Sequence, residues 1–132
     1  MAFKKKVWFV GSNPSRKNDD KMTPFYGTKS HMTLISWIAT LDVSDYGFIN
    51  ASNEFAVDGK VKVTKDDYLR LYTVLGNKQL VVALGKIASD TLVKLDIPHY
   101  RLPHPSPRNR ILNDSNVVEE HLAKCKEYLK NL

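Results

Sequence analysis

Short apolar segments, each the length of one strand, alternate along this chain with longer segments that have helical spacing. The apolar segments are Lys6 to Val10, Tyr46 to Asn50, Gln79 to Leu84 and Ile97 to Leu102. They mostly lack an alternation of apolar and polar residues, which is typical of strands that are covered on both faces. The pattern therefore predicts an α/β fold with three layers, α/β/α, around a four-stranded parallel sheet.

The segments between the strands place apolar residues three or four positions apart, as one face of a helix does. In chain order these residues are Ile35, Ile38 and Ala39; Leu69, Tyr72 and Leu75; and Ile87, Ala88, Thr91, Leu92 and Leu95. A last helix is expected to carry on one side Val117, Val118, His121, Leu122, Cys125, Tyr128 and Leu129. Thr64 and Asp67 have the spacing of a capping box, which predicts a helix start there. The predicted order is βαβαβαβ, followed by this last helix.

Length and composition limit the classes of protein to consider. The 132 residues suffice for one domain with its own core, so we expect a single domain over residues 1–132. Cys125 is the single cysteine, which excludes an internal disulfide and any all-cysteine metal site, and we expect neither a metal nor another cofactor. No apolar run approaches the roughly 20 residues of a membrane span, and the first one is too short for a secretory signal. We expect a cytoplasmic monomer.

The charge balance indicates what kind of partner to look for. Lysine and arginine total 20 against 14 acidic residues, which gives a net charge of +6. Such a balance favours a polyanionic partner, because basic side chains that neutralise phosphates release counterions.

In open parallel sheets, ligands bind beyond the carboxyl ends of the strands. The first such segment, residues 11–15, has a glycine and a proline that suit a tight turn, either as a plain connection or to bring backbone N–H groups to an anion or base. It lacks the lysine of a P-loop and the spaced glycines of a dinucleotide fingerprint. The last segment, residues 103–110, holds three prolines among Ser, Arg and Asn residues. It predicts a stiff exposed loop whose side chains contact phosphates or enter a DNA groove.

Five short motifs in this order carry a resemblance to a known family. They are Gly11-Ser12-Asn13-Pro14, Pro24-Phe25-Tyr26-Gly27, Phe48-Ile49-Asn50, Val82-Ala83-Leu84-Gly85 and His104-Pro105-Ser106-Pro107. Over most of its length the chain resembles the uracil-DNA glycosylase superfamily. The Gly-x-Asn-Pro form is similar to the mismatch-specific and single-strand-selective branches, whereas the most efficient uracil branch has Asp where this chain has Asn13. The iron–sulfur branch shares the Pro-Phe-x-Gly motif, but its cluster cysteines are missing here.

The resemblance implies a DNA glycosylase that flips a uracil-type base out of the strand and hydrolyses its N-glycosidic bond. Asn13 and His104 would be the catalytic residues. His104 would stabilise the negative charge that develops at O2 of the base, and Asn13 would orient the attacking water. We expect a slow enzyme, because an amide cannot take a proton as a carboxylate can. Asp19 and Asp20 are alternative sources of a carboxylate.

The resemblance also assigns the binding residues. The base would be bound by Gly11, Ser12, Ser15, Phe25 and Asn50. Phe25 would stack on the ring, and the Asn50 amide would read uracil O4 and N3–H, a role for which Asn53 is a rival. Ser15 stands where uracil-specific relatives have a tyrosine against C5, so we expect bases with C5 substituents to enter.

The DNA strand itself would be bound by Lys86, Ser106, Arg108, Asn109 and Arg110. Lys86, Ser106 and Arg110 would hold phosphates, and Arg108 would fill the space that the flipped base leaves. We see no lysine that is well placed to form a Schiff base, so hydrolysis without an added lyase step is expected.

Two other interpretations stay open. The short chain and Asn13 in place of Asp are compatible with a catalytically weak or inactive DNA-binding module that has the glycosylase fold. A nucleotide-binding α/β protein of the flavodoxin-like type would instead bind a small molecule and show little salt-sensitive affinity for DNA.

Overall fold

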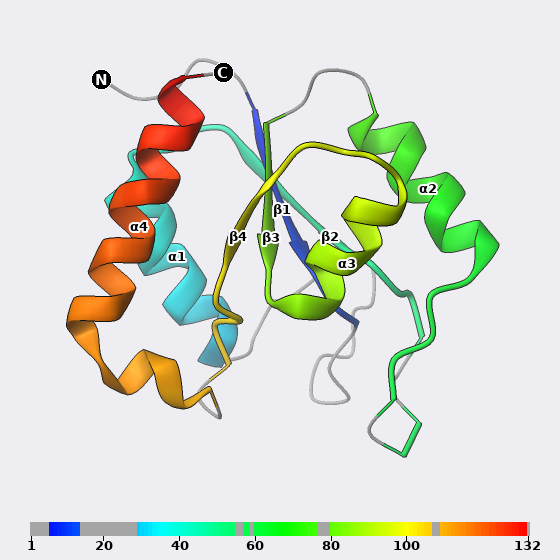
Figure 1. Cartoon of the computed structure of the whole chain (residues 1–132), viewed down its shortest axis with the longest axis horizontal. Coiled ribbons are helices and arrows are strands. Elements are labelled where there is room, and N and C mark those ends of the chain that lie inside the picture. Colours follow the sequence, from blue (N-terminus) through cyan, green and yellow to red (C-terminus); the bar gives the residue numbers. More distant parts are fainter. Residues whose placement is uncertain are drawn as a thin grey trace.

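The computed structural model of the chain describes residues 6–13, 29–54, 57–58, 60–76, 80–106 and 109–131. In chain order its elements are β1 (Val7–Gly11), α1 (Lys29–Leu41), β2 (Tyr46–Asn50), α2 (Lys65–Leu75), β3 (Leu80–Leu84), α3 (Lys86–Lys94), β4 (Tyr100–Leu102), the 3-10 helix η1 (Arg110–Asn113) and α4 (Ser115–Lys130) (Figure 1). The strands form one parallel sheet in the order β2-β1-β3-β4. The predicted α/β class with four parallel strands is confirmed.

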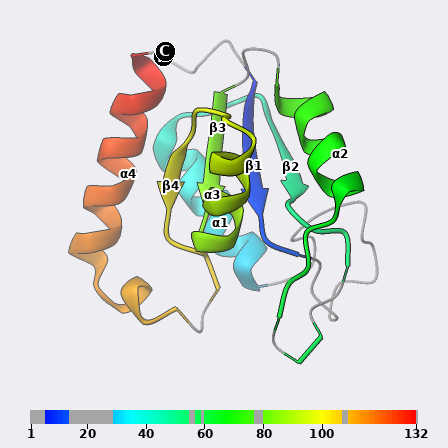
Figure 2. The same cartoon turned by 45° about the vertical axis from the view of Figure 1, so that its right-hand side comes forward.

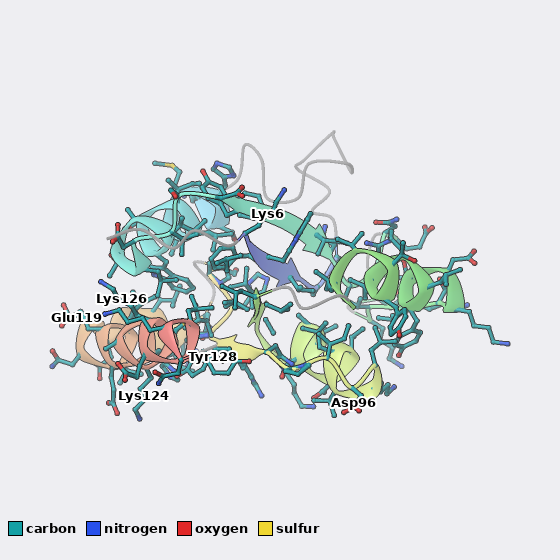
Figure 3. The ribbon with its side chains drawn as sticks, turned by 90° about the horizontal axis from the view of Figure 1, so that it is seen from above. Lys6, Asp96, Glu119, Lys124, Lys126 and Tyr128 are labelled. Carbon is teal, nitrogen blue, oxygen red and sulfur yellow. The ribbon has the colours of Figure 1, made fainter. Side chains whose placement is uncertain are left out.

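Side chains along each strand alternate between the two faces of the sheet, as extended backbone requires. In β3, Val82 and Leu84 join the apolar cluster under α1 and α4, whereas Val81 and Ala83 join the cluster under α2 and α3. The view turned by 45° and the view from above both show the sheet between these two pairs of helices (Figures 2 and 3). The three predicted layers are therefore present.

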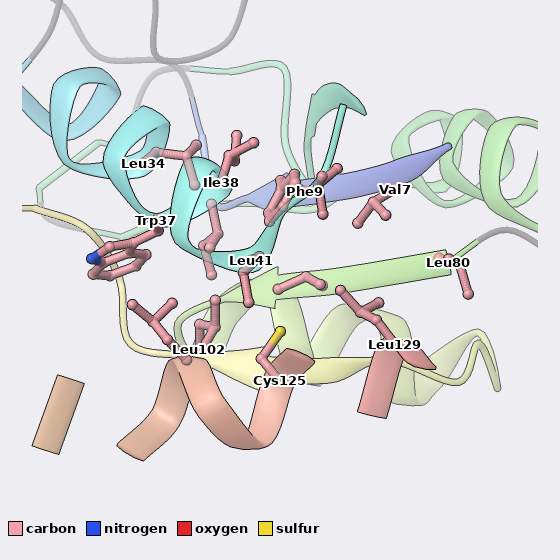
Figure 4. Packing of buried hydrophobic residues seen from close by; sticks show 14 residues of the cluster. Val7, Phe9, Leu34, Trp37, Ile38, Leu41, Leu80, Leu102, Cys125 and Leu129 are labelled. Atoms are coloured by element: carbon pink, nitrogen blue, oxygen red, sulfur yellow. The ribbon is translucent and has the colours of Figure 1, made fainter. Parts of the chain in front are cut away.

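The cluster under α1 and α4 holds the larger core of the described residues (Figure 4). Leu122, Cys125 and Leu129 of α4 are all buried there, as the spacing in the sequence predicts. Burial raises the pKa of the Cys125 thiol to about 12. No helix among the described residues is long and apolar enough to cross a membrane.

Three details of the fold differ from the sequence prediction, the first of them on α2. On the expected apolar face of α2, Leu75 is buried, but Leu69 and Tyr72 are 67% and 58% exposed, so the prediction was wrong for these two residues. The inward side instead carries Asp67 together with Leu71 and Leu75, because the Asp67 carboxylate is drawn to backbone N–H groups, as described below. The predicted capping box is confirmed, since the Thr64 hydroxyl accepts from the Asp67 N–H and the Asp67 carboxylate accepts from the Thr64 N–H.

The fourth strand is also shorter than expected. Ile97 does not extend it, because the Ile97 N–H donates to the Leu92 carbonyl at 3.0 Å and thereby closes the end of α3. The strand begins only at Tyr100. The 3-10 helix η1 was not expected from the sequence.

Candidate active site

All four strands end at the same edge of the sheet, which is the lower edge in Figure 1. Gly11 at the end of β1 pairs with Asn50 at the end of β2. The contact continues past both strands, since the Ala51 N–H donates to the Gly11 carbonyl and the Ser52 N–H donates to the Ser12 carbonyl, each at 2.8 Å. The segments that follow β1 and β2 therefore run side by side.

Asn13 lies two residues beyond the end of β1 and is half-buried. The Ser12 hydroxyl donates to the Asn13 side-chain oxygen at 2.8 Å. This contact orients the Asn13 amide. The hydrogen bond from the Ser52 N–H to the Ser12 carbonyl holds the backbone next to Asn13.

Asn50 is one of the few buried polar residues, with 4% of its surface exposed. Its backbone carbonyl accepts from Arg70, but within the described ranges its side-chain amide makes no hydrogen bond. The amide can therefore bond a ligand that offers one donor and one acceptor. The rival residue Asn53 is exposed. Its backbone N–H donates to the Asp67 carboxylate at 3.3 Å.

His104 lies two residues beyond the end of β4 and packs against Gly85, the residue that follows β3. Gly85 has φ +92 and ψ −179, a conformation that is open essentially to glycine alone. Its N–H donates to the Leu102 carbonyl at 2.8 Å, and a Cβ atom added to it would come within 3.2 Å of His104 Cβ. The glycine thus permits the close approach of the histidine.

The protonation state of His104 follows from its contacts. Its Nδ1 atom accepts the Ser106 N–H at 3.1 Å, so that nitrogen carries no proton in this arrangement. Burial lowers the pKa of His104, because the surroundings disfavour the charged imidazolium. At neutral pH the side chain is a neutral imidazole whose proton is on Nε2.

The segment around His104 is held by bonds within itself. The Asn109 side-chain amide donates to the His104 carbonyl at 3.0 Å and accepts the Ile111 N–H at 3.2 Å, where it caps η1. The Asn109 N–H also donates to the Ser106 carbonyl at 2.9 Å. These bonds give Asn109 a positioning role in the loop, and its predicted contact with DNA stays a prediction.

Positive groups also lie at this edge. Lys86 is the first residue of α3, whose N-terminus has no side-chain cap among the described residues. The positive end of a helix dipole and free backbone N–H groups favour an anion at such a position. The Lys86 ammonium is exposed and pairs with Asp90, while Arg110 is exposed at the start of η1. Ser106 is half-buried nearby in the chain.

Some of the predicted site residues lie outside the described residues, namely Ser15, Phe25 and Arg108, with the alternative carboxylates Asp19 and Asp20. Their roles stay predictions. Within the ranges that are described, no three His, Cys, Asp or Glu side chains gather as metal ligands would.

Two residues at this edge were missed as site residues by sequence reasoning. Asp67 was expected only as a helix cap, yet with Arg70 it links α2 to the segment after β2. The ion pair between neighbouring turns of one helix is visible in the sequence as a spacing of three. Nothing in the sequence indicates that Arg70 of this pair binds the carbonyl of Asn50, which lies 20 residues earlier at the end of β2.

The fold and the site define a class of protein, a parallel α/β domain whose polar segments collect beyond the carboxyl ends of its strands. A family model described as the uracil DNA glycosylase superfamily matches residues 2–130, and the chain therefore belongs to this superfamily. No curated protein matches the chain significantly. Membership indicates a glycosylase-type function and a protein that binds DNA.

Proposed function

We propose that the protein is a monofunctional DNA glycosylase that removes uracil or a 5-substituted uracil from DNA and leaves an abasic site. The observation that supports this most is Asn50, a buried residue beside the end of β1 whose side-chain amide has no hydrogen-bond partner in the described part of the chain. An amide can donate to uracil O4 and accept from N3–H, which satisfies both of its groups. Cytosine offers the opposite pattern at both positions, and it is refused when the amide is held in the orientation that fits uracil. Discrimination is strong when the wrong base leaves buried polar groups unpaired.

His104 acts on the leaving group. As the bond between the sugar and the base breaks, its electron pair stays on the base, and negative charge develops at O2. A neutral imidazole with its proton on Nε2 donates a hydrogen bond to that oxygen without a rearrangement of the loop. A preorganised donor of this kind contributes about 10²–10³-fold to the rate.

Asn13 acts on the other side of the broken bond. The sugar is left as an oxocarbenium ion, which a water molecule captures through its oxygen while its extra proton passes to solvent. The Asn13 amide, oriented by Ser12, holds this water. It cannot accept the proton as a carboxylate can, so the enzyme lacks general-base assistance of about 10²–10⁴-fold and is slow.

DNA is held by the phosphate contacts that the positive groups at this edge offer. Lys86 with the N-terminus of α3, Ser106 and Arg110 bind the strand on either side of the flipped nucleotide. Phe25 stacks on the base, Ser15 faces C5 and Arg108 fills the vacated space. Flipping costs roughly a few kcal/mol, which these contacts offset.

The test is excision from one DNA strand that carries uracil, 5-hydroxymethyluracil, thymine or cytosine at the same position. Single-turnover reactions are followed by alkali, which cleaves at abasic sites. We expect excision of uracil and 5-hydroxymethyluracil, slower excision of thymine and none of cytosine. Salt-sensitive DNA binding without abasic sites from any base would instead favour the DNA-binding module.

A pair of matched variants tests the assignment of the base-reading residue. Asn50→Ala should excise uracil much more slowly, at a rate that is still measurable, while it retains DNA binding, whereas Asn53→Ala should retain both. The reverse result would transfer the role to Asn53. Ser15→Tyr should restore a preference for uracil over its C5-substituted forms, and unchanged substrate choice would show that Ser15 does not face C5.

A further inference from the structure

We propose that Arg70 is a positioning residue for base recognition, which holds the end of β2 and thereby sets the direction of the Asn50 amide. This inference rests on the proposed function. Arg70 does not touch the base or the DNA in this assignment, and it acts only through Asn50.

The guanidinium of Arg70 meets the end of β2 at two consecutive carbonyls. Its Nη2 atom donates to the Asn50 carbonyl at 2.8 Å and lies 3.2 Å from the Ala51 carbonyl. β2 is an edge strand in the order β2-β1-β3-β4, and its backbone bonds to a strand on one side only. Backbone groups on the outer side of such a strand need other partners. Arg70 is such a partner for the carbonyl of Asn50, the residue whose side chain is proposed to recognise the base.

Arg70 is itself held in place by Asp67. Its Nη2 atom lies 3.0 Å from Asp67 Oδ1, and Asp67 is 4% exposed. The same carboxylate accepts the Asn53 N–H at 3.3 Å and the Thr64 N–H at 2.9 Å. Burial opposes ionisation of Asp67, but hydrogen bonds from Thr64, Arg70 and Asn53 outweigh it and lower the pKa of this carboxyl. We call Asp67 and Arg70 the bracket, because together they tie the first turns of α2 to residues 50–53.

The bracket holds the backbone of residues 50–53, and Asn50 is the residue of this segment that depends most on it. Within the described ranges the Asn50 amide has no hydrogen bond of its own. The position of the amide relative to a base is therefore set by the backbone to which it is attached and by the packing that buries the residue. A displacement of about 1 Å at a reacting or recognition group can reduce a rate by about 100-fold. Loss of the bracket should consequently lower the excision rate and leave phosphate contacts elsewhere unaffected.

The experiment is a double-mutant cycle on uracil excision. Arg70→Met removes the donors and keeps an apolar stem, Asn50→Ala removes the amide, and the double variant combines them. Single-turnover rates, DNA dissociation constants and thermal midpoints are measured for each. We expect Arg70→Met to lower the uracil rate by roughly 10–100-fold without a matching loss of DNA affinity. In the Asn50→Ala background the same change should have no further effect on the rate, because coupled residues are not additive.

Two further variants separate positioning from folding. Arg70→Lys retains a charge and donors that can reach one carbonyl, and it should recover part of the rate. Arg101→Met removes the same kind of side chain from an exposed position on β4 and should leave the rate unchanged. If Arg70→Met does not fold, the cycle is run with Arg70→Lys in its place.

Several outcomes would overturn the inference alone. With an active wild type, one such outcome is that Arg70→Met excises uracil at the wild-type rate. The others are additive losses of rate in the double variant and a loss that is confined to DNA affinity. An inactive wild type would instead overturn the proposed function and the inference together.

Discussion

The segments that follow β2 and β4 reach the same edge of the sheet, but they are held there by different means. Residues 50–53 are fixed from outside, by a charged pair on α2 in which Asp67 is buried and Arg70 is half-buried. The segment around His104 is fixed by neutral bonds between its own backbone and Asn109, with Gly85 beneath it. The first arrangement depends on contacts between distant parts of the chain, and the second on local ones. The two segments should therefore respond differently to substitution and to acid.

The largest effect is expected at His104, where the segment after β4 performs chemistry. His104→Ala should reduce single-turnover uracil excision by about 10²–10³-fold, because a preorganised donor to the leaving base is lost. DNA affinity should stay nearly the same, since the contact strengthens only as charge develops. Rates and equilibrium binding to the same strand check this. Parallel losses of rate and affinity would mean that His104 binds the ground state.

Gly85→Ala breaks the support of the same segment without removing a reacting group. A Cβ atom at φ +92 is strained and would crowd His104 Cβ at 3.2 Å. The free energy of unfolding should fall by about 2–3 kcal/mol, and uracil excision should slow because His104 is displaced. Urea unfolding and single-turnover rates provide the measurements. Wild-type stability and rate together would show that the loop accommodates the added methyl group.

Asp67→Asn tests the other segment, and its effect should depend on pH. The pKa of Asp67 in the folded protein lies below its ordinary value of 3.8, so its stabilising effect is complete above that value. It is lost as the pH falls through the folded pKa. Near pH 7 the substitution should cost about 1–2 kcal/mol, because buried N–H groups lose a charged acceptor. In strong acid the wild type and the variant should converge.

The measurement is urea unfolding of both proteins over a range of pH, with the exposed neighbour Asp66→Asn as the control. His104 gives the contrasting case. Its pKa is lowered by burial from 6.5, so the folded protein already begins to lose stability as the pH falls below that value. A constant difference between wild type and Asp67→Asn at every pH would contradict the role of the ionised carboxylate.

The smallest effect is expected at Arg110, where the segment after β4 continues into η1. Arg110→Ala should weaken DNA binding almost equally for all sequences and reduce the slope of log affinity against log salt by about 1. Titrations at several salt concentrations measure this slope. Lys124→Ala on α4, where the ammonium pairs with Glu120 at 2.9 Å, is the control and should leave the slope unchanged. An equal slope for wild type and Arg110→Ala would remove Arg110 from the phosphate contacts.

The sequence was sufficient for the layers of the fold because its apolar runs are covered on both faces. The sequence also indicates that Asn13 and His104 follow strands and that Asn50 ends one, and residues at such positions share one edge in a parallel sheet. Their roles in a site stay predictions. The orientation of α2 could not be predicted, because Leu69 and Tyr72 have the same spacing as a buried face. What decides it is the attraction of Asp67 to backbone groups of the loop after β2. Arg70 was missed for the same reason, as its partners lie 19 and 20 residues away.

The burial of Cys125 has a consequence for the kinetics of the fold. With a pKa of about 12, its thiol is almost entirely protonated at neutral pH, and alkylating reagents react with the thiolate. Modification must therefore wait until α4 separates from the sheet and exposes the sulfur to water. As Cys125 is the only cysteine in the chain, the rate of its labelling reports how often this layer opens. The protein thus contains its own probe for the opening of the core between α4 and the sheet.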